Sequence, residues 1–173
     1  MIGDLSRRLQ KIGKVNTTID MIETSISDVI RQTVDFASRH RKLKTCKVSL
    51  VEQGSNGTIC INPYLIEQML INLMINAADA TDCNGTIMVV VGIDTNNVQI
   101  EVHDNGPGIA PELRDTIFKA YYTTKADGTG LGLATVKTCA ELHGGTVHID
   151  SSPLGGALFK VVIPLKKNRS PQL

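Results

Sequence analysis

The sequence predicts an α/β two-layer sandwich: a mixed, mostly antiparallel sheet with helices on one face, preceded by an N-terminal bundle helix. Three observations predict it. Apolar residues recur at helical spacing in several stretches, runs of alternating or β-branched residues stand between them, and the first helical stretch has a separate period of its own. With 173 residues and 42% hydrophobic residues, the chain is about one domain long and can bury a core.

Composition excludes several classes of protein. A net charge of +1 argues against binding nucleic acid through bulk charge, and 3% aromatic residues argue against base stacking. No run of roughly 18 apolar residues occurs, so no membrane span is expected in this chain. The four cysteines lie far apart without a CxxC pair, which favours reduced thiols. We expect a cytoplasmic location, for the protein alone or as the cytoplasmic part of a membrane-anchored sensor.

The N-terminal segment has the period of a helical bundle. Seven apolar residues are separated by six intervals over 21 residues, a mean spacing of 3.5: Leu5, Leu9, Ile12, Val15, Ile19, Ile22 and Ile26. One helix cannot bury such a seam alone, so residues 1–27 are predicted to be part of a dimerisation helix and its linker. The alternative is an exposed helix that folds back on the domain.

The remaining elements are predicted in chain order. A helix starts at Ser27 or Asp28, and Asn62 and Pro63 cap and open a second one. Gly54–Gly57 predicts a turn that joins two strands into a hairpin. The predicted elements are helix 28–37, strands 47–52 and 58–61, helix 62–81, strands 86–92 and 98–103, a loop 104–130, helix 131–143, strands 146–150 and 157–164, and a disordered tail 167–173.

The segment Asp104-Asn-Gly-Pro-Gly108 follows a strand of alternating residues. A carboxylate buried there can accept a hydrogen bond from an exocyclic amine, and Gly106 and Gly108 allow close backbone approach to a flat ring. Because Asp-Asn-Gly is also common in turns, a simple turn is the competing interpretation.

A second segment, Gly128-Thr-Gly-Leu-Gly132, leads into a predicted helix. Backbone N–H groups and a helix N-terminus favour phosphate. The pattern alone is weak, because it fits neither the dinucleotide fingerprint nor the Walker A motif.

The third feature is a polar stripe on the helix 62–81. At about 100° per residue, Asn72 and Asn76 share a face and Asp79 is adjacent, whereas Glu67 points the opposite way from Asn76. An amide oxygen is a suitable ligand for Mg²⁺. A solvated polar face is the alternative.

Together these motifs resemble the GHKL ATPase superfamily and, within it, the catalytic domain of sensor histidine kinases. Asn72–Ala78 resembles the N box, Asp104–Gly108 the G1 box, Ile117–Lys125 the F box and lid, and Gly128–Leu133 the G2 box. His143-Gly-Gly and the ending 155–164 resemble the closing strands. The resemblance covers residues 28–166, is nearest to the nitrogen-regulation type, and implies the Bergerat fold.

The resemblance implies roles for matched residues with ATP and Mg²⁺ as cofactors. Asp104 accepts the adenine amino group, Asn76 holds Mg²⁺, and Asn72 and Lys125 lie near the phosphates. The remaining nucleotide-binding residues are Gly106, Gly108, Thr124, Gly128, Thr129, Gly130, Leu131 and Gly132. The implied partners are a phosphoacceptor helix of the same kinase, a response regulator, and a second copy bound through the N-terminal helix.

Two departures from the family pattern matter. Many members carry Lys three residues after the Mg²⁺ asparagine, where this chain has Asp79, so one phosphate contact is missing or supplied by Lys125. The seam helix also carries no histidine followed by an acidic residue, the phosphoacceptor motif. The sequence thus predicts the second bundle helix and the catalytic domain, acting on a histidine elsewhere.

Three other functions remain as alternatives. A GHKL hydrolase places Glu one turn before the Mg²⁺ asparagine, but Asn72 stands there and an amide is no general base. An anti-sigma-type serine kinase shares the boxes but usually lacks a bundle helix. A non-catalytic nucleotide-sensing module is the third, and turnover on a supplied histidine helix separates it from a kinase.

Overall fold

The computed structural model describes residues 20–54, 57–125 and 128–165. The elements in chain order are β1 (Ile22–Ser25), α2 (Ile26–Ala37), β2 (Lys47–Gly54), β3 (Thr58–Ile61), α3 (Pro63–Ala80), β4 (Thr86–Ile93), β5 (Asn97–Asp104), the 3-10 turn η1 (Pro111–Leu113), α4 (Gly132–Leu142), β6 (Thr146–Ser151) and β7 (Ala157–Pro164).

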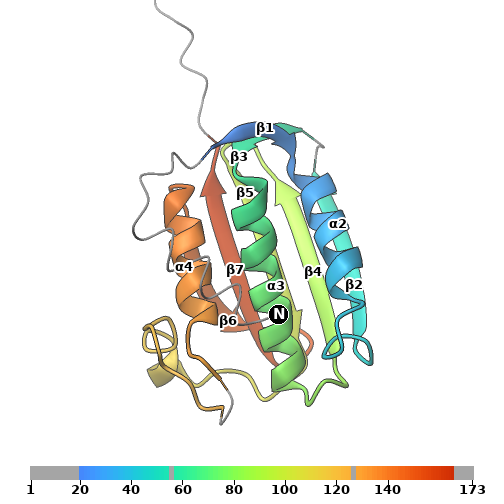
Figure 1. The fold of residues 1–173 in the computed structure, drawn as a ribbon, viewed down its shortest axis with the longest axis vertical. Helices are drawn as coiled ribbons and strands as arrows, with labels where there is room; N and C mark the ends of the chain where they lie inside the picture. The colour runs from blue at the N-terminus through green and yellow to red at the C-terminus, as the bar shows by residue number, and fades with distance from the viewer. Residues whose placement is uncertain (1–19, 55–56, 126–127, 166–173) are drawn as a thin grey trace, which may run out of the picture.

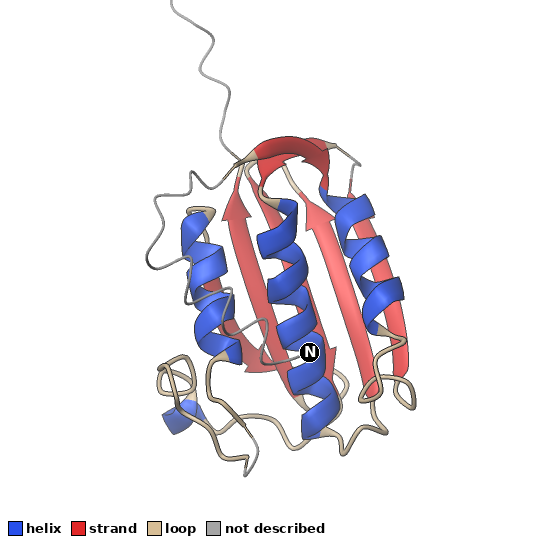
Figure 2. Cartoon of the chain, in the orientation of Figure 1, coloured by secondary structure: helices blue, strands red, loops and turns tan. Residues whose placement is uncertain are grey.

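A five-stranded sheet carries the fold, in the order β2-β4-β5-β7-β6. The β2–β4 pair is parallel and the other three pairs are antiparallel. Helices α2, α3 and α4 lie side by side on one face, with α3 in the middle (Figures 1 and 2). The predicted two-layer α/β sandwich, with helices on one face of a mostly antiparallel sheet, is therefore confirmed.

Helix α3 is the centre of the core. Its N-cap is Asn62, whose side-chain oxygen accepts a hydrogen bond from the Leu65 N–H, and Pro63 occupies the first turn, as predicted. Its inner face buries Ile66, Met69, Leu70, Leu73 and Met74 completely. Burial of each such side chain stabilises the fold by roughly 1.5–3 kcal/mol. This packing fixes the position of the polar face of α3 relative to the sheet.

The predicted hairpin between strands 47–52 and 58–61 is wrong. Strand β2 pairs in parallel with β4, Lys47 lying opposite Thr86, whereas β3 pairs with β1 in a separate two-stranded sheet. The Gly54–Gly57 turn signal is local and carries no information about strand partners. Burial decides them, because Val48 and Leu50 of β2 pack against the main core.

The predicted seam helix is wrong over its last residues. Ile22 lies in strand β1 opposite Ile61, and Ile26 is the first residue of α2. Ser25, rather than Ser27 or Asp28, caps α2 by accepting a hydrogen bond from the Asp28 N–H. Three heptads sample the 3.5 period too briefly to separate it from a strand followed by a helix. The earlier seam residues and the predicted tail 167–173 lie outside the described residues.

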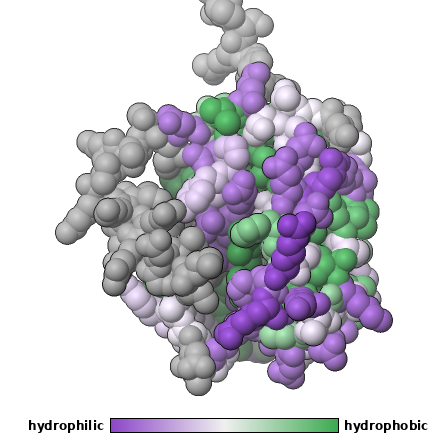
Figure 3. All heavy atoms as spheres, turned by 45° about the vertical axis from the view of Figure 1, so that its right-hand side comes forward, coloured by the Kyte–Doolittle hydropathy of each residue, from purple (hydrophilic) through white to green (hydrophobic). Residues whose placement is uncertain are grey.

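The α2–β2 side of the molecule is held partly by charge. Arg31 of α2 donates to both carboxylate oxygens of Glu52 in β2, at 2.8 and 3.0 Å. In the view that brings this side forward, hydrophilic side chains cover much of the surface, with smaller hydrophobic areas among them (Figure 3). Within the described residues, no helix combines the length and apolar character needed to cross a membrane.

Candidate functional site

Asp104 stands at the end of β5 and is fixed by backbone donors. The residue is 2% exposed, and Oδ1 accepts hydrogen bonds from the N–H of Gly106 at 2.8 Å and of Ala157 at 3.0 Å. Among the described residues, no donor engages the second oxygen, Oδ2. The arrangement leaves one oriented acceptor for an incoming N–H donor.

Gly156 lies against Asp104 and Gly106, and the three residues form one corner of the candidate site. Sequence reasoning did not identify Gly156. Its N–H donates to the Asp104 carbonyl at 3.1 Å. A Cβ on Gly156 would collide with Oδ1 of Asp104 and with the N–H of Gly106. The pair Gly155-Gly156 was visible as a turn in the sequence, but nothing in the sequence indicates that β7 starts beside the end of β5.

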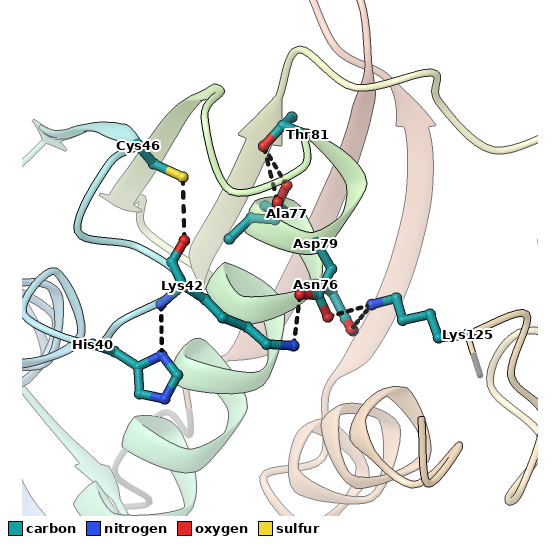
Figure 4. Close-up of polar contacts among 9 residues, drawn as sticks. His40, Lys42, Cys46, Asn76, Ala77, Asp79, Thr81 and Lys125 are labelled. Carbon is teal, nitrogen blue, oxygen red and sulfur yellow. Dashed lines mark hydrogen bonds and ion pairs between the residues drawn. The ribbon is translucent and has the colours of Figure 1, made fainter. Parts of the chain in front are cut away.

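The polar stripe of α3 carries Asn72, Asn76 and Asp79, all half-buried, as the helical spacing predicts. Nζ of Lys125 donates to Oδ1 of Asn76 at 3.3 Å and to Oδ2 of Asp79 at 2.8 Å. On the other side of α3, Nζ of Lys42 lies 2.6 Å from Oδ1 of Asp79 (Figure 4). Asn72 makes no side-chain hydrogen bond within the described part of the chain.

The Asp79 carboxylate is held ionised by its two lysines. Burial alone would raise its pKa, but hydrogen bonds from Lys125 and Lys42 outweigh burial, so the pKa lies below its ordinary value. Lys42, the turn residue that completes this ion-pair cluster, was missed by sequence reasoning. The only signal was its place in the basic run Arg39–Lys42, which is more simply explained by a helix C-terminus.

Helix α4 starts close to the polar stripe. The position that a Cβ would take on Gly132 lies 3.9 Å from Nδ2 of Asn76. Leu131 is the N-cap residue, and no side chain caps the first turn of α4. The start of α4, where no side chain caps the backbone N–H groups and the helix dipole has its positive end, thus lies beside Asn76.

The loop before α4 requires glycine at position 130. Gly130 has a φ of 66°, and a Cβ there would collide with the backbone of Tyr121. The Tyr121 N–H also donates to the Gly130 carbonyl at 3.0 Å. This contact joins the predicted lid to the glycine segment. Tyr121 itself is 73% exposed.

The other predicted nucleotide-binding residues lie around these groups. The N–H of Gly128 donates to the Lys125 carbonyl at 3.1 Å, whereas Thr124 and Thr129 are exposed in the lid. Gly108 has a φ of 76° and lies next to Gly156. The structure therefore brings Asp104, Gly106 and Gly108 together at one end of the site, and Asn76, Lys125 and Gly132 together at the other.

The histidines are engaged elsewhere. Nδ1 of His143 donates to the Cys139 carbonyl at 2.7 Å, and Nε2 accepts from the Asn62 N–H at 3.0 Å, which ties the end of α4 to the start of α3.

The other histidines also have partners away from the site. On the sheet, His103 contacts Glu101, and His148 contacts Thr146. His40 accepts from the Lys42 N–H. None of these contacts involves Asn76, Lys125 or Asp104.

The polar groups of the site fit a purine nucleotide with a divalent cation. Oδ2 of Asp104 suits an exocyclic amino group, the amide oxygen of Asn76 suits a hard cation, and the start of α4 suits phosphate. Helix α3 connects the two ends of the site. Asn76 lies on this helix, and the carbonyl of its last residue, Ala80, is 2.8 Å from the position that a Cβ on Gly106 would take.

Known proteins support this interpretation. The family model described as histidine kinase-, DNA gyrase B-, and HSP90-like ATPase matches residues 61–167. Sensor histidine kinase ZraS of Salmonella typhimurium is 33% identical over 162 residues, which cover 93% of this chain and 34% of that protein. Sensor histidine kinase CpxA of Escherichia coli is 38% identical over 112 residues, which cover 61% and 24%. The chain thus spans about a third or less of these relatives.

Two solved structures show the same fold at moderate identity. The catalytic domain of histidine kinase ThkA aligns with a TM-score of 0.74 at 29% identity, over 84% of this chain and 97% of that one. Full-length ShkA in complex with AMPPNP aligns with a TM-score of 0.77 at 27% identity, over 94% and 35%. The chain belongs to the histidine kinase-, DNA gyrase B- and HSP90-like ATPase family, with the fold of the histidine kinase catalytic domain.

Proposed function

We propose that this chain binds Mg²⁺–ATP and transfers the γ-phosphoryl group to a histidine on a separate helix. The observation that carries the proposal is the juxtaposition of Asn76 with Lys125 and the uncapped start of α4. In-line phosphoryl transfer depends mainly on positioning and on neutralising charge. An amide ligand, a lysine and a helix N-terminus at one place supply both functions.

Each group has a distinct task in this proposal. Oδ2 of Asp104 accepts a hydrogen bond from the adenine amino group, while its other oxygen stays bound to two backbone N–H groups. Asn76 would hold Mg²⁺, which when bound would offset the charge that develops on the phosphates. Lys125 contacts the phosphates, and the Gly128–Gly132 segment lies against them. The acceptor imidazole nitrogen forms a bond to the γ-phosphorus as the bond to the ADP oxygen breaks, so that ADP leaves and the N–H proton of the imidazole passes to solvent.

The residues of α3 favour transfer over hydrolysis. Asn72, one turn before Asn76, has an amide that cannot take a proton from water. Glu67, on the same helix, is nine residues before Asn76 and therefore lies on the other side of α3. The proposal includes a response regulator that receives the phosphoryl group and a homodimer formed through the N-terminal segment. The resemblance to the nitrogen-regulation type also stays a prediction.

Transfer to a separate helix is the direct test of this function. Radiolabelled ATP and Mg²⁺ incubated with this chain alone should give no acid-labile, base-stable phosphate. Label should appear on an added phosphoacceptor helix hairpin, or on full-length kinase whose own site carries Asp104→Asn. Labelling of the isolated chain at His40, His103, His143 or His148 would contradict the proposal, as would an acceptor that stays unlabelled while nucleotide is bound.

Nucleotide should protect the lid, residues 119–129, from proteolysis. Lys119 and Lys125 are exposed, and the segment has few apolar side chains to offset the entropy of ordering it. Contacts between phosphate and Lys125 would supply that energy. Trypsin should therefore cleave after these lysines several-fold more slowly with an ATP analogue and Mg²⁺, while cleavage after the exposed Arg39 serves as the control. Equal rates with and without the analogue would reject the prediction.

A further inference from the structure

Asp79 and Asn76 together hold a cation in this structure. The ammonium nitrogen of Lys125 lies 2.8 Å from Oδ2 of Asp79 and 3.3 Å from Oδ1 of Asn76 (Figure 4). The two oxygens come from residues three apart on α3, so their side chains leave the same face of the helix. One carboxylate and one amide oxygen directed at one positive charge form the kind of donor pair that Mg²⁺ binds.

We propose that Asp79 is a second protein ligand for the divalent cation of the nucleotide complex, and that Lys125 occupies the cation's place until the cation arrives. The inference rests on the proposed function, since the remaining ligands are the phosphates and water. Mg²⁺ binds oxygen at about 2.0–2.1 Å, so the two side chains need to close by only about 1 Å around it. Lys125, once displaced, is free to contact the phosphates.

Electrostatics favours this arrangement over a carboxylate left facing the phosphates. A bare Asp79 beside a triphosphate would be repelled, because like charges at short range in a partly buried site cost energy. A divalent cation between them reverses the sign of that interaction. Asp79 stands where many family members carry Lys, and here Lys125 and Lys42 flank it, so the three side chains together carry the single positive charge that one Lys would supply.

Lys42 acts as a positioning residue in this proposal. It approaches α3 from the turn after α2, on the side opposite the lid, and binds Oδ1 of Asp79 at 2.6 Å (Figure 4). The side chains of Lys42 and Asp79 are 30% and 15% exposed, so the pair is partly shielded from water. With Oδ1 engaged by Lys42, Oδ2 is the oxygen that binds Lys125, whose ammonium nitrogen also contacts Asn76.

The coupling between Mg²⁺ and ADP tests the proposal. ADP binding is measured by calorimetry on the whole chain, once in EDTA and once in excess Mg²⁺, and the ratio of the two affinities is the readout. Asp79→Ala removes both oxygens at a helical position that Ala suits. We expect this variant to lose at least about tenfold of the Mg²⁺ enhancement, while its affinity for ADP in EDTA stays the same or rises.

Two further variants sharpen the result. Glu67→Ala removes a carboxylate from the same helix, away from Lys125, and should keep the wild-type ratio. Lys42→Met keeps Asp79 but removes its ion pair with Lys42. This variant should lower the ratio of the ADP affinities with and without Mg²⁺ by less than Asp79→Ala does. Thermal unfolding monitored by circular dichroism verifies that each variant is folded.

The alternative is that Asp79 merely fastens the lid through Lys125. In that case Asp79→Ala would change ADP affinity equally with and without Mg²⁺, and the unchanged ratio would overturn the proposal. If Mg²⁺ enhances ADP binding by the wild-type chain and by Asp79→Ala to the same degree, this inference is wrong but the proposed function stands. A wild-type chain that binds no ADP in either condition contradicts the proposed function itself, and this inference with it.

Discussion

Asp104→Asn should weaken ATP binding by at least about 100-fold while leaving the fold intact. The two backbone N–H groups of Gly106 and Ala157 select the amide oxygen of the new side chain as their acceptor. Its NH₂ group then faces the site, where adenine also presents an NH₂ group. The variant loses a charge-assisted hydrogen bond to adenine and places its own NH₂ group against the adenine NH₂ group. Each of these effects costs about 1–3 kcal/mol of binding free energy. Calorimetry with ATP and Mg²⁺ measures the change.

The same geometry predicts a change in base preference. The wild-type chain should bind GTP far more weakly than ATP, because the guanine carbonyl would face the Asp104 carboxylate. In Asp104→Asn the NH₂ group can donate to that carbonyl, so the preference for ATP should shrink or disappear. Asp35→Asn, on the exposed face of α2, removes the same charge and should change neither affinity. Equal affinity of the wild-type chain for ATP and GTP would contradict this role for Asp104.

Gly156→Ala should abolish nucleotide binding and lower stability. The added Cβ would collide with Oδ1 of Asp104 and approach the Asp104 carbonyl at 2.7 Å, so the ends of β5 and β7 must move apart. Overpacking of this kind typically costs about 1–3 kcal/mol of folding free energy. It would also break the hydrogen bonds that orient the carboxylate. Urea unfolding and ADP calorimetry measure the two effects.

Gly57→Ala is the matched control for that substitution. A Cβ on Gly57 would meet no atom of the described residues within 4 Å, so stability and ADP binding should both stay near the wild-type values. If Gly156→Ala bound ADP as well as Gly57→Ala does, the corner formed by Asp104, Gly106 and Gly156 would not be the base-binding site.

The parts of the site that lie within one element could be predicted from the sequence. Helical spacing alone places Asn72, Asn76 and Asp79 on one face of α3, and the capping pair Asn62-Pro63 gives its start. The Asp104 motif and the glycine segment before α4 were also identifiable, because their chemistry depends on consecutive residues.

Contacts between distant segments could not be predicted in the same way. Gly156 borders the candidate site because β7 pairs with β5, and Lys42 reaches it because its turn brings the side chain to Asp79 of α3. The parallel β2–β4 pairing likewise follows from burial of Val48 and Leu50 rather than from the glycine turn that follows β2. Such contacts are set by the packing of the whole domain, and a single sequence does not report them.

An amide NMR titration of this chain with ADP and Mg²⁺ tests whether distant segments of the chain form one nucleotide-binding site. We expect shifts at glycines from three separate segments that border one site: Gly106, Gly108, Gly130, Gly132 and Gly156. Gly54 and Gly92 should stay unchanged, because they lie at the end of β2 and β4 away from Asp104, whose partner in β4 is Ile87. Shifts confined to Gly54 and Gly92, or no shifts at saturating ADP, would contradict this prediction.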